Sequence, residues 1–88
     1  MATKEEWKHK IEAAGGKGFS TSVYVAEYLD NFDVIDYHWM DSEEEDNLKI
    51  RNKFARELRK DGFTVKSFSS PCMGRTFYNL EAERYKGD

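Results

Sequence analysis

The sequence FSTSVYVAEYLDNFDVIDYHWM, from Phe19 to Met40, decides between two folds for this chain. In the first interpretation, residues 20–29 and 32–40 form a hairpin that turns at Asp30-Asn31. In the second, Ser20 caps a helix that continues through Phe32. The elements expected after this stretch are the same in both cases, so the choice depends on residues 20–40 alone.

Local preferences favour the hairpin. Thr21, Val23, Tyr24 and Val25 form a run of β-branched and aromatic residues, which is typical of strands. No Glu or Gln follows Ser20 or Thr21 at the third position, so no capping box supports a helix here. An Asp-Asn pair also tolerates the positive φ angles that a tight hairpin turn requires.

A two-residue turn in this hairpin pairs Ala26 with Ile35 and Tyr24 with Tyr37. One face of the hairpin then carries Tyr24, Ala26, Tyr28, Ile35, Tyr37 and Trp39, and the other face is also partly apolar. A sheet with two partly apolar faces requires cover on both sides. Two predicted helices are available to supply this cover.

The first helix is expected over residues 4–14. Thr3 and Glu6 form a capping box, and Gly15-Gly16 ends the helix because glycine enters the left-handed conformation freely. Trp7, Ile11 and Ala14 follow at helical spacing and define one buried stripe.

The second helix is expected over residues 43–60. A capping box at Ser42–Glu45 begins it, and Asp61-Gly62 ends it. Ile50, Phe54 and Leu58 define its buried stripe, and Glu45 precedes Lys49 by four residues, the favourable order for an ion pair.

Two strands follow, at residues 63–69 and 76–85, with a loop at 70–74 between them. In the second of these strands, Tyr78, Leu80 and Ala82 share the core side. Phe68 and Phe77 lie on the opposite side, beside Lys66 and Arg75. If exposed, these aromatic rings would stack single-stranded nucleic acid, but we expect the first helix to bury them.

The predicted fold is therefore α+β. The chain of 88 residues forms one domain, in which two helices accompany an antiparallel sheet of about four strands. The alternative is a winged helix-turn-helix, with a helix at 21–31, a recognition helix at 43–60 and a wing at 63–85.

Composition excludes several classes of protein. Thirteen aromatic residues are too many for a disordered chain, and a single cysteine, Cys72, excludes a disulfide framework. Without a signal-like or membrane-spanning segment, we expect a cytoplasmic protein. His9, His38 and Cys72 do not assemble into a recognisable catalytic or metal-binding pattern, so we expect neither an enzyme nor a metal or cofactor site.

The most specific functional signal is a basic helix face. At 100° per residue, the cations of the second helix gather on one arc opposite Phe54. A surface of one sign attracts phosphate, which predicts a nucleic-acid (DNA or RNA) contact. Its expected residues are Lys49, Lys53, Arg56, Arg59 and Lys60, with Lys66 and Arg75 on the following strands.

An acidic run gives the alternative function. Here the chain is a protein-interaction or inhibitor module that docks a basic partner through Asp41, Glu43, Glu44, Glu45 and Asp46. Residues 1–46 hold 4 Lys+Arg and 12 Asp+Glu, whereas residues 47–88 hold 10 and 5. The net charge of −3 thus conceals an acidic and a basic half. We expect a non-catalytic binding module that favours nucleic acid, and homodimerisation is compatible with both functions.

Overall fold

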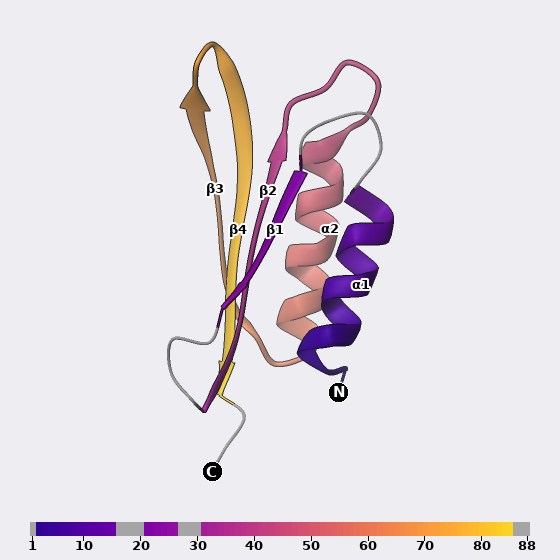
Figure 1. Ribbon diagram of the computed structural model, residues 1–88, viewed down its shortest axis with the longest axis vertical. Helices are drawn as coiled ribbons and strands as arrows, with labels where there is room; N and C mark the ends of the chain where they lie inside the picture. The colour runs from indigo at the N-terminus through magenta and orange to yellow at the C-terminus, as the bar shows by residue number, and fades with distance from the viewer. Residues whose placement is uncertain (1, 16–20, 27–30, 86–88) are drawn as a thin grey trace.

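A computed structural model describes residues 2–15, 21–26 and 31–85 of the chain (Figure 1). Within them, two helices lie against one antiparallel sheet, which confirms the α+β class. The elements, in chain order, are α1 (Lys4–Gly15), β1 (Thr21–Ala26), β2 (Phe32–Met40), α2 (Asn47–Lys60), β3 (Thr64–Cys72) and β4 (Arg75–Tyr85).

The stretch that decides the fold is a pair of strands. β1 runs antiparallel to β2, so the helix expected at 21–31 in the winged-helix alternative is wrong. The β-branched and aromatic residues of this stretch follow their intrinsic preference for the extended backbone. The proposed turn at Asp30-Asn31 falls partly outside the described residues.

The register of this hairpin differs from the prediction by one residue. Val25, rather than Ala26, pairs with Ile35, and Val23, rather than Tyr24, pairs with Tyr37. A two-residue turn requires an even number of residues between paired positions, whereas the observed register leaves an odd number. This register is not the one that the assumed two-residue turn implies.

Both helices cover the same face of the sheet, whose strand order is β1-β2-β4-β3 (Figure 1). The expectation of cover on both faces is wrong. Phe68, expected in the core, is 44% exposed on the uncovered face. The two helices pack side by side instead, and α1 lies against β1 and β2 while α2 lies against β3 and β4.

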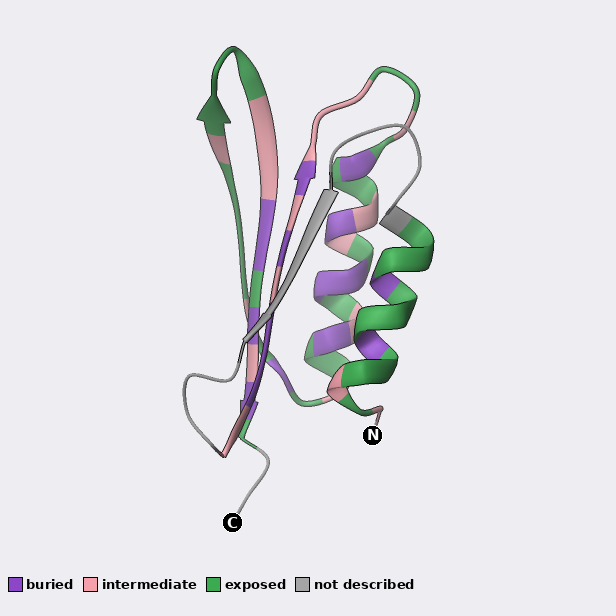
Figure 2. Cartoon of the chain, in the orientation of Figure 1, coloured by how far each residue is buried: buried purple, intermediate pink, exposed green. Residues whose placement is uncertain are grey.

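The core lies between the helices and the sheet (Figure 2). Trp39 stacks on Phe54 of α2 with ring centroids 6.4 Å apart, and Tyr37 contacts Trp39 at 4.2 Å. Several predicted core residues are confirmed as fully buried: Ile11, Ile35, Tyr37, Trp39, Leu58 and Leu80. Ile50 and Tyr78, also predicted for the core, are only partly buried against it. Ala14, predicted for the buried stripe of α1, is exposed.

α2 begins four residues later than predicted. Its N-cap is Asp46, whose carboxylate accepts a hydrogen bond from the Lys49 backbone nitrogen at 3.1 Å. Asn47 is 2% exposed and its amide donates to the Met40 carbonyl at 2.7 Å. This link ties the first turn of α2 to the end of β2 and fixes where the helix starts. Glu45 consequently precedes the helix, so its predicted helical pairing with Lys49 is wrong.

The second hairpin is longer than predicted. β3 continues through Ser70 and Pro71 to Cys72, where a loop was expected. Met73 and Gly74 form the turn with φ angles of 51° and 79°, the pattern of a two-residue type I′ hairpin turn. Pro71 is accommodated because β3 is an edge strand.

A buried ionic network joins the ends of the elements opposite this hairpin tip. Arg84 of β4 donates to Asp33 of β2 at 2.9 Å and to Asp61, after α2, at 3.0 Å. Asp61 Oδ2 also accepts from Trp7 Nε1 of α1 at 2.7 Å and from the Ala2 nitrogen at 3.1 Å. The Arg84 guanidinium lies 4.3 Å from the centre of the Phe63 ring. One arginine therefore links both helices to both central strands.

Replacing Arg84 should destabilise the protein strongly. Arg84→Met leaves the buried carboxylate of Asp33 and the partly buried carboxylate of Asp61 without their cation, so we expect a loss of about 3 kcal/mol in the free energy of unfolding. Urea denaturation at neutral pH measures it. The matched control is Arg75→Met, whose ion pair with Asp41 is 45% exposed on the arginine side and should contribute less than about 1 kcal/mol. Equal losses in the two variants would contradict this assignment.

The network also predicts that the free energy of unfolding depends on pH. The hydrogen bond from Trp7, assisted by Ala2 and the charge of Arg84, lowers the pKa of Asp61 below its ordinary value despite partial burial. A lowered pKa stabilises the fold above the unfolded-state pKa of about 3.9, and this contribution disappears as the pH falls through the folded-state pKa. The difference in unfolding free energy between wild type and Asp61→Asn should therefore shrink below about pH 4. A difference that stays constant from pH 7 to about pH 2.5 would show that the charge of Asp61 contributes nothing.

Candidate nucleic-acid interface

The outer face of α2 carries a group of exposed cations. The helix buries Phe54, Ala55 and Leu58 against the sheet, and the 3.6-residue period turns the opposite side to solvent. That side extends about 16 Å between its first and last cation. We call it the α2 basic face, and its exposed members are Lys49, Lys53, Arg56, Arg59 and Lys60.

Arg59 is the best-fixed member of the α2 basic face. Its guanidinium donates to the Val65 carbonyl of β3 at 3.3 Å while the side chain stays exposed. The dipole of α2 adds little positive potential here, because its negative end lies beside Arg59 and Lys60. The positive potential of this face therefore comes from side-chain charges alone.

Arg51 is the sixth cation of α2 and points inward. Its guanidinium donates to the Phe68 carbonyl at 2.9 Å and to Asn52 Oδ1 at 2.8 Å. Burial lowers the pKa of Arg51, against an opposing effect of Tyr78. Arg51 therefore serves the packing of α2 against β3, and it occupies the Asn52 oxygen that a base-reading contact would need. No role for Arg51 was expected from the sequence, because no local pattern indicates this packing contact.

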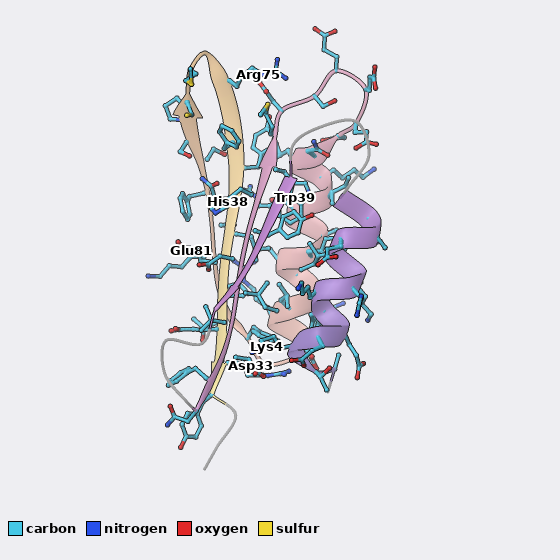
Figure 3. The ribbon with its side chains drawn as sticks, in the orientation of Figure 1. Lys4, Asp33, His38, Trp39, Arg75 and Glu81 are labelled. Atoms are coloured by element: carbon cyan, nitrogen blue, oxygen red, sulfur yellow. The ribbon has the colours of Figure 1, made fainter. Side chains whose placement is uncertain are left out.

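Two of the predicted interface residues lie elsewhere. Lys66 belongs to the uncovered sheet face, where it is paired in register with Glu81. Arg75 lies at the hairpin end and donates to Asp41 Oδ1 at 3.0 Å (Figure 3). Neither residue contributes to the α2 basic face. The sequence alone could not show this, because the position of β3 and β4 relative to α2 depends on the tertiary fold.

The described part of the uncovered sheet face carries more acidic than basic side chains. Asp36 lies opposite Glu81 on the neighbouring strand, and burial, with the charge of Glu81, raises the pKa of Asp36 against an opposing effect of His38. His38 Nδ1 lies 2.6 Å from Asn79 Oδ1, and Asn79 Nδ2 donates to Ser70 Oγ at 2.8 Å (Figure 3). Although Phe68 and Lys66 are exposed beside one another here, the carboxylates make this face a poor surface for nucleic acid.

The predicted acidic site is the loop between β2 and α2. Asp41 is engaged by Arg75, and Asp46 caps α2. Glu43 and Glu44 are exposed, and the Glu44 nitrogen donates to Ser42 Oγ at 3.1 Å. The acids are thus close in space, but those at the two ends of the run already have structural partners.

The residues considered for catalysis or metal binding are dispersed. His9 is exposed on α1, and the side chain of His38 lies on the sheet face turned away from the helices (Figure 3). Cys72 is exposed at the hairpin end. Across residues 2–15, 21–26 and 31–85, no three His, Cys, Asp or Glu side chains are arranged to hold a metal ion.

Comparison with known proteins adds no family to this description. No protein-family model matches the sequence, and no curated protein or solved structure matches it significantly. In the described part of the chain, neither helix is both long enough and apolar enough to cross a membrane.

Proposed function

We propose that this protein is a non-catalytic nucleic-acid-binding module that contacts the phosphate backbone through the α2 basic face. The observation that supports the proposal is the exposure of five cations on one side of a helix whose opposite side is buried. Basic side chains on such a surface displace the counterions that surround phosphate, and this release supplies most of the affinity of sequence-independent binding.

The proposed contact is to phosphates, and readout of adenine is not expected from it. The α2 basic face consists of Lys and Arg, and the neighbouring Asn52 is held by Arg51 through two hydrogen bonds. Direct readout of adenine would require a free Asn or Gln amide. Binding should therefore show no preference for adenine and should depend strongly on salt.

The acidic loop limits where a polyanion can lie. Lys49 is in the first turn of α2, three residues after the N-cap Asp46 and close in sequence to Glu44 and Glu45. Repulsion from these carboxylates weakens a phosphate contact at Lys49. The centre of the proposed contact is consequently the stretch from Lys53 to Lys60.

Salt-titrated anisotropy with single- and double-stranded DNA and RNA tests the proposal. With about four phosphate contacts, log K for duplex DNA should fall with log salt at a slope of about −4. The Lys53→Gln/Arg56→Gln variant should reduce this slope to about −2 and weaken binding at least tenfold at about 50 mM salt. The control Lys66→Gln/Arg75→Gln removes the same charge elsewhere and should leave the slope unchanged. Undetectable binding of all four nucleic acids at about 50 mM salt would refute the proposal.

The acidic loop supports a second candidate, docking of a basic protein partner. Glu43 and Glu44 are exposed and lie outside the cap of α2, which is formed by Asp46. Charge reversal at these two residues should therefore leave the helix intact. Glu43→Lys/Glu44→Lys should weaken the capture of a basic partner, such as polylysine-coated beads, without weakening nucleic-acid binding. Unchanged capture by a folded variant would exclude the loop as a docking site.

A further inference from the structure

β3 has an outer edge that no other strand covers within the described residues. It is the last strand in the sheet order, and it is exposed along most of its nine residues. Phe68, at its centre, is 44% exposed. Such an edge presents backbone N–H and C=O groups to which another strand can add.

The hairpin turn determines which residues point their backbone groups outward. Met73 and Gly74 form a two-residue turn, so Cys72 and Arg75 are the hydrogen-bonded pair that closes it. Hydrogen-bonded and non-hydrogen-bonded pairs then alternate along the strands. The backbone of Phe68 is therefore hydrogen-bonded to that of Asn79 on β4, whereas Ser67 and Ser69 direct their backbone N–H and C=O groups away from β4.

Two neighbouring residues support this assignment and limit the usable edge. The Val65 carbonyl, which points outward by the same alternation, accepts a hydrogen bond from Arg59. Pro71, also an outward position, lacks an N–H group. The part of the edge that can accept another strand is therefore residues 66–70.

We propose that this edge pairs with the same edge of a second copy of the chain, antiparallel and centred on Phe68. The local sequence Ser67-Phe68-Ser69 reads the same in both directions, so a twofold axis through Phe68 pairs each Ser67 with Ser69 of the partner subunit. The two pairs provide about four backbone hydrogen bonds. This proposal does not depend on the nucleic-acid function.

The same arrangement brings compatible side chains opposite one another across the interface. Phe68 lies opposite Phe68 of the partner subunit, and aromatic cross-strand pairs stabilise sheets. Lys66 lies opposite Ser70 of the partner subunit, so no like charges are paired. Leu48 is 38% exposed and lies about 20° from Arg59 around the α2 axis. Because Arg59 bonds to Val65 of β3, Leu48 lies on the flank of α2 that borders β3, beside the proposed contact.

The dimer would be a continuous eight-stranded sheet. Antiparallel addition within one sheet keeps equivalent faces on the same side, so all four helices lie together. The most outward-pointing cations of the α2 basic face (Lys49, Lys53, Arg56 and Lys60) remain accessible, because they project away from the sheet. The interface is small, and we expect a Kd on the order of 10–100 µM.

Sedimentation equilibrium from about 5 to about 500 µM tests the proposal. The wild-type mass should rise from one chain toward two. Ser69→Pro removes an N–H group that points away from β4, so the hydrogen bonds between β3 and β4 are kept, as they are at Pro71. This variant should raise the Kd of the dimer at least tenfold. Ser69→Ala keeps the N–H group and should dimerise like wild type. Circular dichroism verifies that both variants are folded.

Cross-linking tests the register without depending on the proline variant. In a Cys72→Ser background, F68C places two thiols directly opposite, within disulfide reach. K66C is the control, because its two copies are about 13 Å apart in this register. Mild oxidation should give a covalent dimer with F68C at least tenfold faster than with K66C. A monomer throughout the concentration range, a dimer that persists in folded Ser69→Pro, or equal cross-linking of the two cysteine variants would overturn the proposal.

Discussion

The interaction on which the rest of the structure depends is the buried contact of Arg84 with Asp33 and Asp61. These residues come from β4, β2 and the end of α2, and Asp61 extends the network to Trp7 of α1. A cation buried between two carboxylates is stable only when its hydrogen bonds are well satisfied. The donors of Arg84 reach both carboxylates and the carbonyls of Ala2 and Asp61, so the network fixes how the helices sit on the sheet.

The placement of both helices on one face separates the charges of the molecule. The basic residues of α2 project to the helix side, whereas Asp36 and Glu81 lie on the uncovered sheet side. The helix side also carries Glu5 and Glu6 of α1, so this separation of charge is between α2 and the uncovered sheet face and does not follow the two halves of the sequence. Each half supplies one helix and one hairpin in the same order, α1-β1-β2 and α2-β3-β4, although the sequence shows no internal repeat.

The elements of the fold and the α2 basic face could be predicted because they depend on local periodicity and turn residues. Trp7, Phe54 and Leu58 follow the helical period, and the cations opposite Phe54 are exposed as expected. The start of α2 was missed because it depends on Asn47, which bonds to the distant Met40. The inward role of Arg51 and the exposure of Phe68 were missed for the same reason: each depends on which elements pack together, and no local pattern records this.

The hydrogen bond between Ala2 and Arg84 joins residues 82 positions apart, and this separation has a consequence for folding. The entropic cost of closing a loop rises only with the logarithm of its length. A contact between residues far apart in the sequence therefore adds little further cost once the neighbouring elements have formed. The first helix–hairpin half contributes Trp7 and Asp33 to the network, and the second contributes Asp61 and Arg84. Neither half can complete these polar contacts without the other, so we expect the two halves to fold and unfold together.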